Sequence, residues 1–227
     1  MIIDVIIPAF NEADAIGMVL QDIPKHLIRH IVVVNNGSTD ETASVAASCG
    51  AIVVNEPQRG YGNACLAAMA HLAGCEPQPQ IVVFLDADHS DHPEQLGSVV
   101  DPILKDEADL VIGSRALGER EAGSMMPQQV FGNWLATRLM RWSYGIRYTD
   151  LGPFRAIRWS TLMAIGMRDR TFGWTVEMQL KASRGGWRHV EVPVDYRKRI
   201  GVSKVSGTVK GSVLAGYRII ATILKHR

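Results

Sequence analysis

Apolar positions in the first half of the chain form short runs separated by longer amphipathic stretches. The short runs are rich in β-branched residues and predict strands at 2–7, 31–34, 51–54, 81–85 and 109–112. The stretches between them predict helices over 13–22, 40–48, 64–73 and 93–105. Alternating apolar strands and helices are typical of an α/β fold, in which helices cover both faces of a mostly parallel sheet.

Local signals refine the boundaries of these helices. Ser38 and Glu41 form a capping-box pattern before the second helix, and Asn63 stands where it could cap the third. Asp91 and Pro93 favour the opening of a helix at about residue 93.

The second half is less regular. Helices are expected over 130–142, 174–184 and 212–224, strand-to-helix material over 154–164, and an edge strand over 188–196 because Pro193 suits an edge. Residues 197–211 are basic and rich in Gly and Ser, which predicts a mobile loop. Since no linker separates the halves, we expect one domain over 1–227 with a C-terminal elaboration.

Overall composition is that of an ordinary globular protein, with 227 residues, 47% hydrophobic and 21% charged. The net charge of +1 conceals a strong asymmetry. Residues 1–110 carry 4 basic and 16 acidic side chains, whereas 111–227 carry 20 basic and 7 acidic. This split indicates a bipartite site, one side for a cation and the other for phosphates or an anionic surface. The alternative is two solvated surfaces that neutralise each other.

Cysteine usage and the N-terminus favour the cytoplasm. The three cysteines, Cys49, Cys65 and Cys75, form no Cys-x-x-Cys pair, so we expect neither a disulfide framework nor a structural zinc site. The first ten residues contain Asp4 and lack a basic segment, unlike a signal peptide. No apolar run approaches the roughly 18 residues of a membrane span.

The sharpest candidate chemistry follows the strand at 81–85. Asp86 and Asp88 could both reach one hard cation there, and Mg²⁺ or Mn²⁺ prefers a few carboxylates plus phosphate oxygens. The alternative is that one of them caps the next helix, although Asp91 is better placed to do so.

Two further strand ends carry polar groups. Asn35 and Asn36 could read a nucleotide base, and an amide matches uracil; alternatively Asn36-Gly37 forms a turn. Arg115, in Gly-Ser-Arg after the strand at 109–112, could bind phosphate oxygens, or it is a plain surface arginine.

Two candidates lie further along the chain. Glu177 stands beside Trp174 and Met178, where desolvation could raise its pKa and suit it to act as a general base. The alternatives are pairing with Lys181 at i+4 or a buried structural role. In the basic segment, a mobile loop could close on phosphates, although a solvated charge run has the same composition.

Together these motifs resemble family 2 glycosyltransferases. They are IPAFNE (7–12), VVVNNGSTD (32–40), LDADHSDHPE (85–94), IGSR (112–115), TDLGPFRA (149–156), GWTVEMQ (173–179) and EVPVDYRKRIGVSK (191–204). The ordered set covers about residues 1–210 and is similar to the dolichyl-phosphate-mannose-synthase-like branch. The resemblance implies a GT-A fold, a nucleotide-sugar donor, a divalent metal and inversion at the anomeric carbon.

Matching positions carry implied roles. Residues 1–115 would form the nucleotide-sugar-binding half, and 116–227 the acceptor-binding half. Asn36 would meet the base, while Asp86 and Asp88 would hold the ribose and the metal–diphosphate. The residues implied to border the nucleotide are Pro8, Ala9, Asn11 and Glu12, and those implied to bind phosphate of donor or acceptor are Arg115, Arg199, Ser203 and Lys204.

The resulting prediction is a hexosyltransferase that uses a nucleotide-diphosphate sugar, with UDP favoured over GDP, and polyprenyl phosphate as acceptor. An ionised lipid phosphate needs no base, whereas a hydroxyl acceptor would require Glu177 or Asp150 to take its proton. Four alternatives stay open: a retaining glycosyl-phosphoglycerate-type synthase, a soluble-acceptor transferase, a nucleotidyltransferase, and a non-catalytic nucleotide-sugar-binding subunit.

Apolar stripes edged by basic residues suggest where the acceptor could lie. Residues 125–142 and the last predicted helix, 212–224, both have this character, which suits a membrane interface or a lipid chain. Packing on the core or on a second subunit of a homodimer is the alternative. We therefore expect a cytoplasmic enzyme that visits the inner membrane surface, with no nucleic-acid partner.

Overall fold

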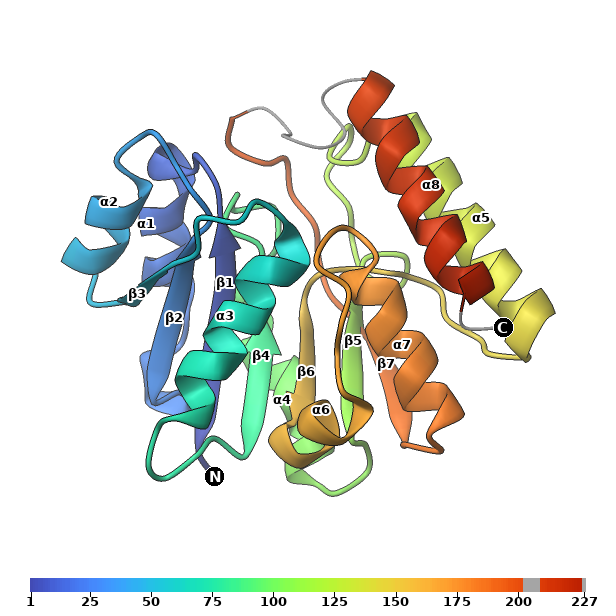
Figure 1. Ribbon diagram of the computed structural model, residues 1–227, viewed down its shortest axis with the longest axis horizontal. Coiled ribbons are helices and arrows are strands. Elements are labelled where there is room, and N and C mark those ends of the chain that lie inside the picture. Colours follow the sequence, from blue (N-terminus) through green and yellow to red (C-terminus); the bar gives the residue numbers. More distant parts are fainter. Residues whose placement is uncertain (202–208, 226–227) are drawn as a thin grey trace.

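The computed structural model describes the backbone of residues 1–201 and 209–225, and side chains outside 202–215 and 226–227. Its described strands form one seven-stranded sheet in the order β3-β2-β1-β4-β6-β5-β7 (Figure 1). The strands are β1 (Ile3–Ala9), β2 (His30–Asn35), β3 (Ile52–Asn55), β4 (Ile81–Phe84), β5 (Leu110–Ser114), β6 (Arg155–Arg158) and β7 (His189–Pro193). All neighbouring pairs are parallel except those of β6, so the prediction of a mostly parallel α/β sheet is confirmed.

Helices cover both faces of this sheet (Figure 1). On one face lie α1 (Ala13–Asp22), α2 (Thr42–Ser48) and α4 (Leu96–Leu104), whose apolar side chains share a core with the strands. On the other face lie α3 (Tyr61–Ala73), α6 (Trp159–Ile165) and α7 (Trp174–Arg184). Adjacent strand residues such as Ile6 and Ile7 are both fully buried, because each faces a different helix layer.

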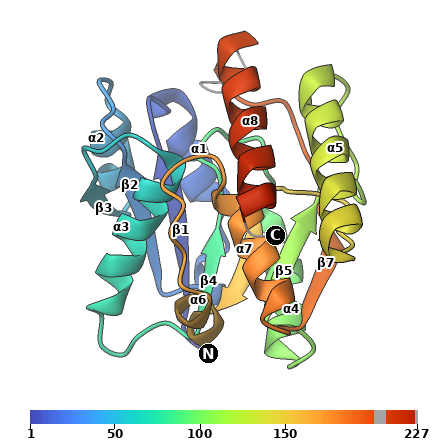
Figure 2. The same ribbon diagram turned by 45° about the vertical axis from the view of Figure 1, so that its right-hand side comes forward.

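Two long helices extend the second layer. Helices α5 (Pro127–Tyr144) and α8 (Val209–Lys225) run alongside each other at one end of the molecule (Figure 2). Within the described residues, no helix is both long and apolar enough to cross a membrane.

The antiparallel strand β6 has a consequence for the site. Phe84 of β4 pairs with Arg155, the first residue of β6. The segment that leads into β6 therefore lies at the same sheet edge as the carboxyl ends of β4 and β5. Strand β7, parallel to β5 and at the sheet edge as predicted, delivers the residues after Pro193 to that edge as well.

Two predicted helix caps are wrong. The Ser38 hydroxyl accepts a hydrogen bond from the Asn11 backbone N–H at 3.0 Å, and α2 begins at Thr42 after a tight turn held by Asp40. Helix α3 begins at Tyr61, before Asn63, whose side-chain amide donates to the Arg59 carbonyl. Ser38 is therefore engaged by a distant segment, whereas Asn63 lies inside the first turn of α3 and bonds a residue just before the helix.

Candidate active site

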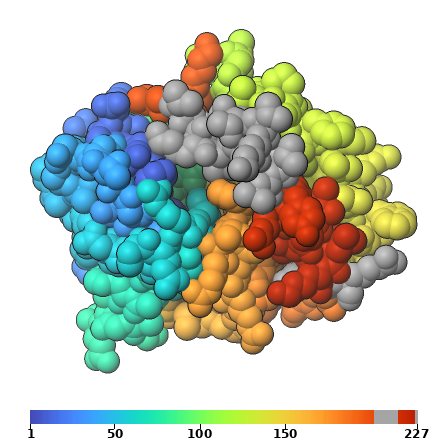
Figure 3. Space-filling view, turned by 45° about the horizontal axis from the view of Figure 1, so that its top comes forward, coloured from blue at the N-terminus to red at the C-terminus, as the bar shows by residue number. Residues whose placement is uncertain are grey.

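A cleft with a cavity volume of about 380 Å³ opens at the carboxyl edge of the sheet. In Figure 3 this face has the N-terminal elements, in blue and cyan, on one side and the elements of the second half on the other. Six predicted site residues line the cleft and bring acidic and basic side chains together: Pro8, Glu12, Asp86, Asp88, Arg115 and Arg199.

The acidic wall consists mainly of the residues after β4. Asp88 is only 5% exposed, and its Oδ1 accepts hydrogen bonds from the backbone N–H and hydroxyl of Ser90, at 2.9 and 2.5 Å. Burial, together with the neighbouring Asp88 charge, raises the pKa of Asp86 to about 7. Asp91 lies deeper, and burial first and the Asp86 charge second raise its pKa as well. Crowded, desolvated carboxylates of this kind are stabilised by a cation.

These residues fit a divalent metal bound jointly with phosphate. Among the described residues, no group of three or more His, Cys, Asp or Glu side chains is arranged to hold a metal. Asp86 and Asp88 nevertheless both line the cleft, and their mutual repulsion marks a site of negative potential. Mg²⁺ characteristically takes one or two carboxylates and completes its shell with water and substrate phosphates.

Arg115 forms the basic wall and is fixed by Asp150. Its Nε and Nη2 donate to Asp150 Oδ2 and Oδ1, both at 2.8 Å, and its backbone N–H donates to Oδ2 at 2.9 Å. The Leu151 backbone N–H supplies a fourth hydrogen bond. Although burial opposes ionisation, the Arg115 charge and hydrogen bonds keep the pKa of Asp150 below its usual value. Asp150 is thus a carboxylate engaged in orienting Arg115.

A second cavity of about 330 Å³ adjoins the first, and Arg115 and Met125 line both. Its walls combine the basic Arg120 with polar Asn133 and Thr149 and with the apolar side chains of Val130 and Trp134 on α5. Asp150 is the one carboxylate among the described residues of its lining. Side chains of α5 and of the segment before β6 therefore meet near Arg115.

Arg199 reaches the acidic wall from the segment after β7. Its Nη2 lies 2.7 Å from Asp88 Oδ2 and 3.3 Å from Glu12 Oε1. The next residue, Ile200, donates its backbone N–H to the Asp88 carbonyl at 2.9 Å. Ser203 and Lys204, assigned to the same basic loop, lie outside the described residues, as do positions 202–208 of the predicted mobile segment.

The asparagine pair at the end of β2 bonds protein groups of neighbouring segments. Asn36 Nδ2 donates to the carbonyls of Glu56 and Gln58, and its Oδ1 accepts the Gly60 N–H, so its amide ties down the loop before α3. Asn35 Nδ2 donates to Asn55 Oδ1, while its Oδ1 accepts the Ser38 N–H. Neither residue belongs to the described lining of the cleft. Loop backbone engages the Asn36 amide, whereas the Asn35 amide bonds the Asn55 side chain and the Ser38 backbone.

Two residues implied to border the nucleotide shape the loops beside the cleft. Ala9 is the buried last residue of β1. Asn11 adopts a φ of 53°, and its side-chain oxygen accepts the Thr39 N–H at 2.8 Å. Both lie next to Phe10, a cleft residue, and are not part of the described lining themselves.

Glu177 lies outside the cleft lining and holds a loop. Its carboxylate pairs with Lys181 at 2.7 Å and accepts the backbone N–H groups of Arg168 and Asp169. The expected rise in pKa is wrong: although burial opposes ionisation, these contacts lower the pKa of Glu177. The arrangement matches the alternative of a structural carboxylate paired at i+4.

The loop held by Glu177 in turn positions the start of α3. Gly62 and Asn63 donate their backbone N–H groups to the carbonyls of Thr171 and Arg170. A Cβ on Gly62 would lie 2.0 Å from the Asp169 carbonyl oxygen, so only glycine permits this close approach. The adjacent Tyr61 lines the cleft, and its hydroxyl hydrogen-bonds Asp86.

Sequence reasoning missed three aromatic cleft residues. Phe10 stacks under Arg59, whose guanidinium carbon lies 3.5 Å from the ring centroid, and Tyr61 contacts Asp86. The Tyr196 ring lies 5.0 Å from the guanidinium carbon of Arg115. Phe10 and Tyr196 fall within motifs already noted, IPAFNE and VDYRKR, so their position at strand ends was the available signal.

A mostly parallel sheet with helices on both faces and an Asp-x-Asp pair at its carboxyl edge are features of the GT-A glycosyltransferase fold. The model of the Glycosyl transferase family 2 family matches residues 4–166. The chain therefore belongs to glycosyl transferase family 2 and is a glycosyltransferase.

Relatives support the same branch. An uncharacterised glycosyltransferase of Mycobacterium tuberculosis is 38% identical over 221 residues, covering 94% of each chain. A dolichyl-phosphate hexose transferase of Haloferax volcanii is 31% identical over 225 residues, covering 98% of this chain and 94% of the relative. Glucosyl-3-phosphoglycerate synthase from Mycobacterium tuberculosis, solved with Mn²⁺, UDP-glucose and phosphoglyceric acid, has a TM-score of 0.78 at 23% identity over 99% of this chain and 79% of that chain. These findings confirm the predicted family, branch and fold.

Proposed function

We propose that this glycosyltransferase moves a hexosyl unit from a UDP-sugar to a polyprenyl phosphate, with inversion at the anomeric carbon and with Mg²⁺ or Mn²⁺ bound. On the donor side, the support is an acidic wall that fits a metal–diphosphate and a fold shared with a synthase solved with Mn²⁺ and UDP-glucose. On the acceptor side, the support is a relative named as a dolichyl-phosphate hexose transferase.

One observation carries the choice of a phosphate acceptor. Both carboxylates considered as bases are engaged: Asp150 with Arg115, and Glu177 with Lys181 outside the cleft. A hydroxyl acceptor must lose a proton, whereas a phosphate monoester with a second pKa near 6 is already ionised at neutral pH. Asp150 is the one carboxylate in the described lining of the second cavity, and Arg115 neutralises it. A phosphate acceptor, which needs no base, therefore suits this cavity.

In this proposal an acceptor phosphate oxygen attacks the anomeric carbon, and the bond from that carbon to the donor diphosphate breaks. Arg115, oriented by Asp150, lies between the two cavities and binds phosphate oxygens of donor or acceptor. Asp86 and Asp88 would hold the metal, which, when bound, neutralises charge that develops on the leaving diphosphate. Arg199 supplies a further positive charge for that diphosphate.

Release of nucleoside diphosphate tests the acceptor directly. The purified protein is given UDP-hexose, Mn²⁺ and one of three acceptors: a short-chain polyprenyl phosphate, the matching polyprenol, or 3-phosphoglycerate. We expect UDP release only with the polyprenyl phosphate. Release with the polyprenol would show that a base is available to a hydroxyl acceptor and would contradict the choice of a phosphate. Release with 3-phosphoglycerate alone would favour the soluble-acceptor alternative. This acceptor is included because the chain shares its fold with glucosyl-3-phosphoglycerate synthase.

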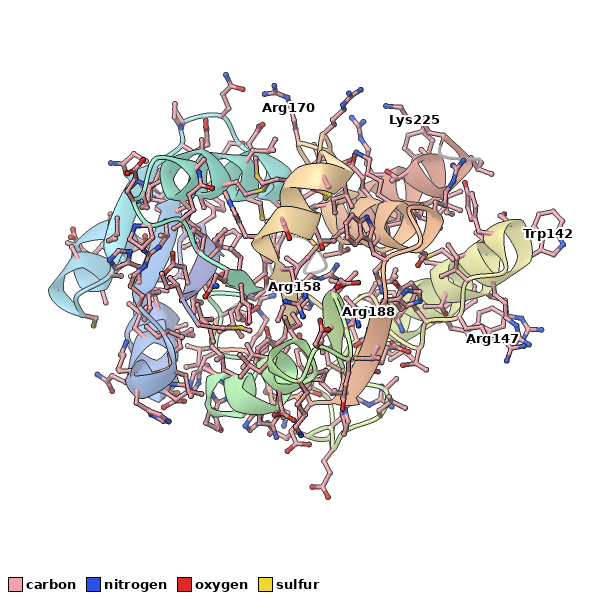
Figure 4. The ribbon with its side chains drawn as sticks, turned by 90° about the horizontal axis from the view of Figure 1, so that it is seen from below. Trp142, Arg147, Arg158, Arg170, Arg188 and Lys225 are labelled. Carbon is pink, nitrogen blue, oxygen red and sulfur yellow. The ribbon has the colours of Figure 1, made fainter. Side chains whose placement is uncertain are left out.

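The same function places an exposed apolar surface of α5 against lipid. Phe131, Trp134 and Trp142 are 61%, 53% and 75% exposed, and Trp142 points away from the helix (Figure 4). Arg138 belongs to the same helix, with its guanidinium carbon 5.8 Å from the Trp134 ring centroid. Exposed aromatic side chains beside arginine suit an anionic membrane interface.

Flotation with anionic liposomes tests this contact. Trp134→Glu should reduce the bound fraction, whereas Met163→Glu, at a 49% exposed apolar position on α6, should leave it unchanged. Equal binding by both variants and the unmodified protein would contradict a role for α5 at the membrane.

A further inference from the structure

The guanidinium of Arg199 lies so close to Asp88 that it would repel a metal ion bound to the same carboxylate. Arg199 Nη2 contacts Asp88 Oδ2 at 2.7 Å, and the Asp88 and Glu12 side chains are only 7% and 9% exposed. Asp88 Oδ1 is occupied by two hydrogen bonds from Ser90. A cation bound to the other oxygen, Oδ2, would therefore compete with Arg199 for it.

Electrostatics makes these two cations antagonists when no nucleotide is present. A divalent ion sits about 2.1 Å from a carboxylate oxygen, so an ion on Oδ2 would lie within a few ångströms of the guanidinium. Repulsion at that distance in a half-buried site is substantial, because little water screens it. The ion and Arg199 then cannot both gain the full attraction of Asp88.

A bound diphosphate would remove the competition between the metal ion and Arg199. Its negative oxygens can accept hydrogen bonds from the guanidinium while they also complete the shell of the ion. Arg199 retains a donor for this purpose, since its Nε is buried without a hydrogen-bond partner among the described residues. Once the diphosphate is present, the two cations share a ligand.

We propose that Arg199 acts as a resident counter-ion of Asp88, which keeps the divalent ion weakly bound until a nucleoside diphosphate enters and takes over the guanidinium. This proposal rests on the metal-dependent donor site of the proposed function. Its consequence is that metal and donor enter together, so the empty enzyme holds little metal.

Electron paramagnetic resonance of free Mn²⁺ measures both halves of the proposal without turnover or acceptor. In the absence of nucleotide, Arg199→Gln should tighten Mn²⁺ binding by about fivefold or more, the lower range of coupling between two sites on one protein. In the presence of UDP, the same variant should weaken the joint binding of Mn²⁺ and UDP. Opposite signs in the two conditions are the expected result.

Two variants control the measurement. Lys198→Gln removes the same charge from the neighbouring position, which pairs with Glu121 and is 59% exposed, and it should behave like the unmodified protein. Arg199→Lys keeps the charge and should retain weak Mn²⁺ binding without nucleotide. Circular dichroism confirms that each variant is folded before binding is compared.

The outcomes separate this proposal from the proposed function. Arg199→Gln that weakens Mn²⁺ binding in both conditions, or leaves the nucleotide-free affinity unchanged, would overturn the counter-ion role. Absence of Mn²⁺ binding with UDP in the unmodified protein would overturn the metal site itself. Failure to glycosylate polyprenyl phosphate would leave the binding result intact and count only against the acceptor.

Discussion

Replacing Asp150 by Asn should expose how much the protein depends on the fixed position of Arg115. The carboxylate receives three hydrogen bonds from Arg115 and one from Leu151, and it is 1% exposed. An amide keeps the shape but loses the charge and turns an N–H₂ group toward donors. Arg115 is then left as a buried charge without its counter-ion.

Loss of one partner from a buried ion pair costs about 3 kcal/mol or more. For a chain of this size each kcal/mol shifts Tm by about 2–4 °C, so the expected fall is about 6–12 °C. Thermal unfolding followed by circular dichroism measures it. The matched control is Asp106→Asn, which alters a carboxylate bound to Arg158 and Arg188 but 76% exposed at its side chain.

The control should leave Tm nearly unchanged, because water screens exposed pairs. If Asp150→Asn had the same Tm as the unmodified protein, or if Asp150→Asn and Asp106→Asn lowered Tm equally, Asp150 would not be holding a buried arginine. The assignment of this residue as a positioning group would then fail, and its role as a base would need to be reconsidered.

Three other predictions follow from the same contacts. Asp88→Asn should keep the fold and lower metal-dependent turnover by about a hundredfold or more, as measured by UDP release; near-normal turnover would contradict its role. Glu177→Gln should destabilise the protein. Because the pKa of Glu177 is lowered in the folded state, the difference in unfolding free energy between the variant and the unmodified protein should be largest above pH 4.5. It should shrink as the pH falls through the folded-state pKa of Glu177. A difference in urea unfolding that stayed constant down to pH 3 would argue against this. Asn36→Ala should cost about 2 kcal/mol and speed hydrogen exchange over residues 56–60, without changing the ratio of the affinities for UDP and GDP. A changed preference in calorimetry would restore the amide as a base reader.

The sequence was sufficient for the parts of the fold that local pattern controls. Helices α1 and α7 have the predicted bounds, and the strands β1, β2 and β4 lie within two residues of the predicted ones. Buried parallel strands are continuous apolar runs, so their period and their flanking polar residues mark them clearly. The Asp-x-Asp pair was found for the same reason, since it directly follows such a run.

Contacts between distant segments were beyond local pattern. Nothing near Asp150 shows that β6 runs antiparallel and so brings this residue to Arg115, 35 positions earlier. The amides of Asn35 and Asn36 have the right chemistry for a base, but local pattern does not show that they bond the Asn55 side chain and the Glu56 carbonyl. Glu177 was correctly located on a helix, yet its partners come from a loop whose path the sequence does not reveal.

Isolation of the reaction product tests the central claim most directly. The protein is incubated with labelled UDP-hexose, Mn²⁺ and a short-chain polyprenyl phosphate, and the organic phase is analysed by mass spectrometry and NMR. The account predicts a hexose joined through phosphate to the polyprenyl chain, with its anomeric configuration inverted relative to the donor. Label that stays in the aqueous phase with this acceptor, together with formation of a glycosylated 3-phosphoglycerate of retained configuration when that acceptor is supplied, would contradict it.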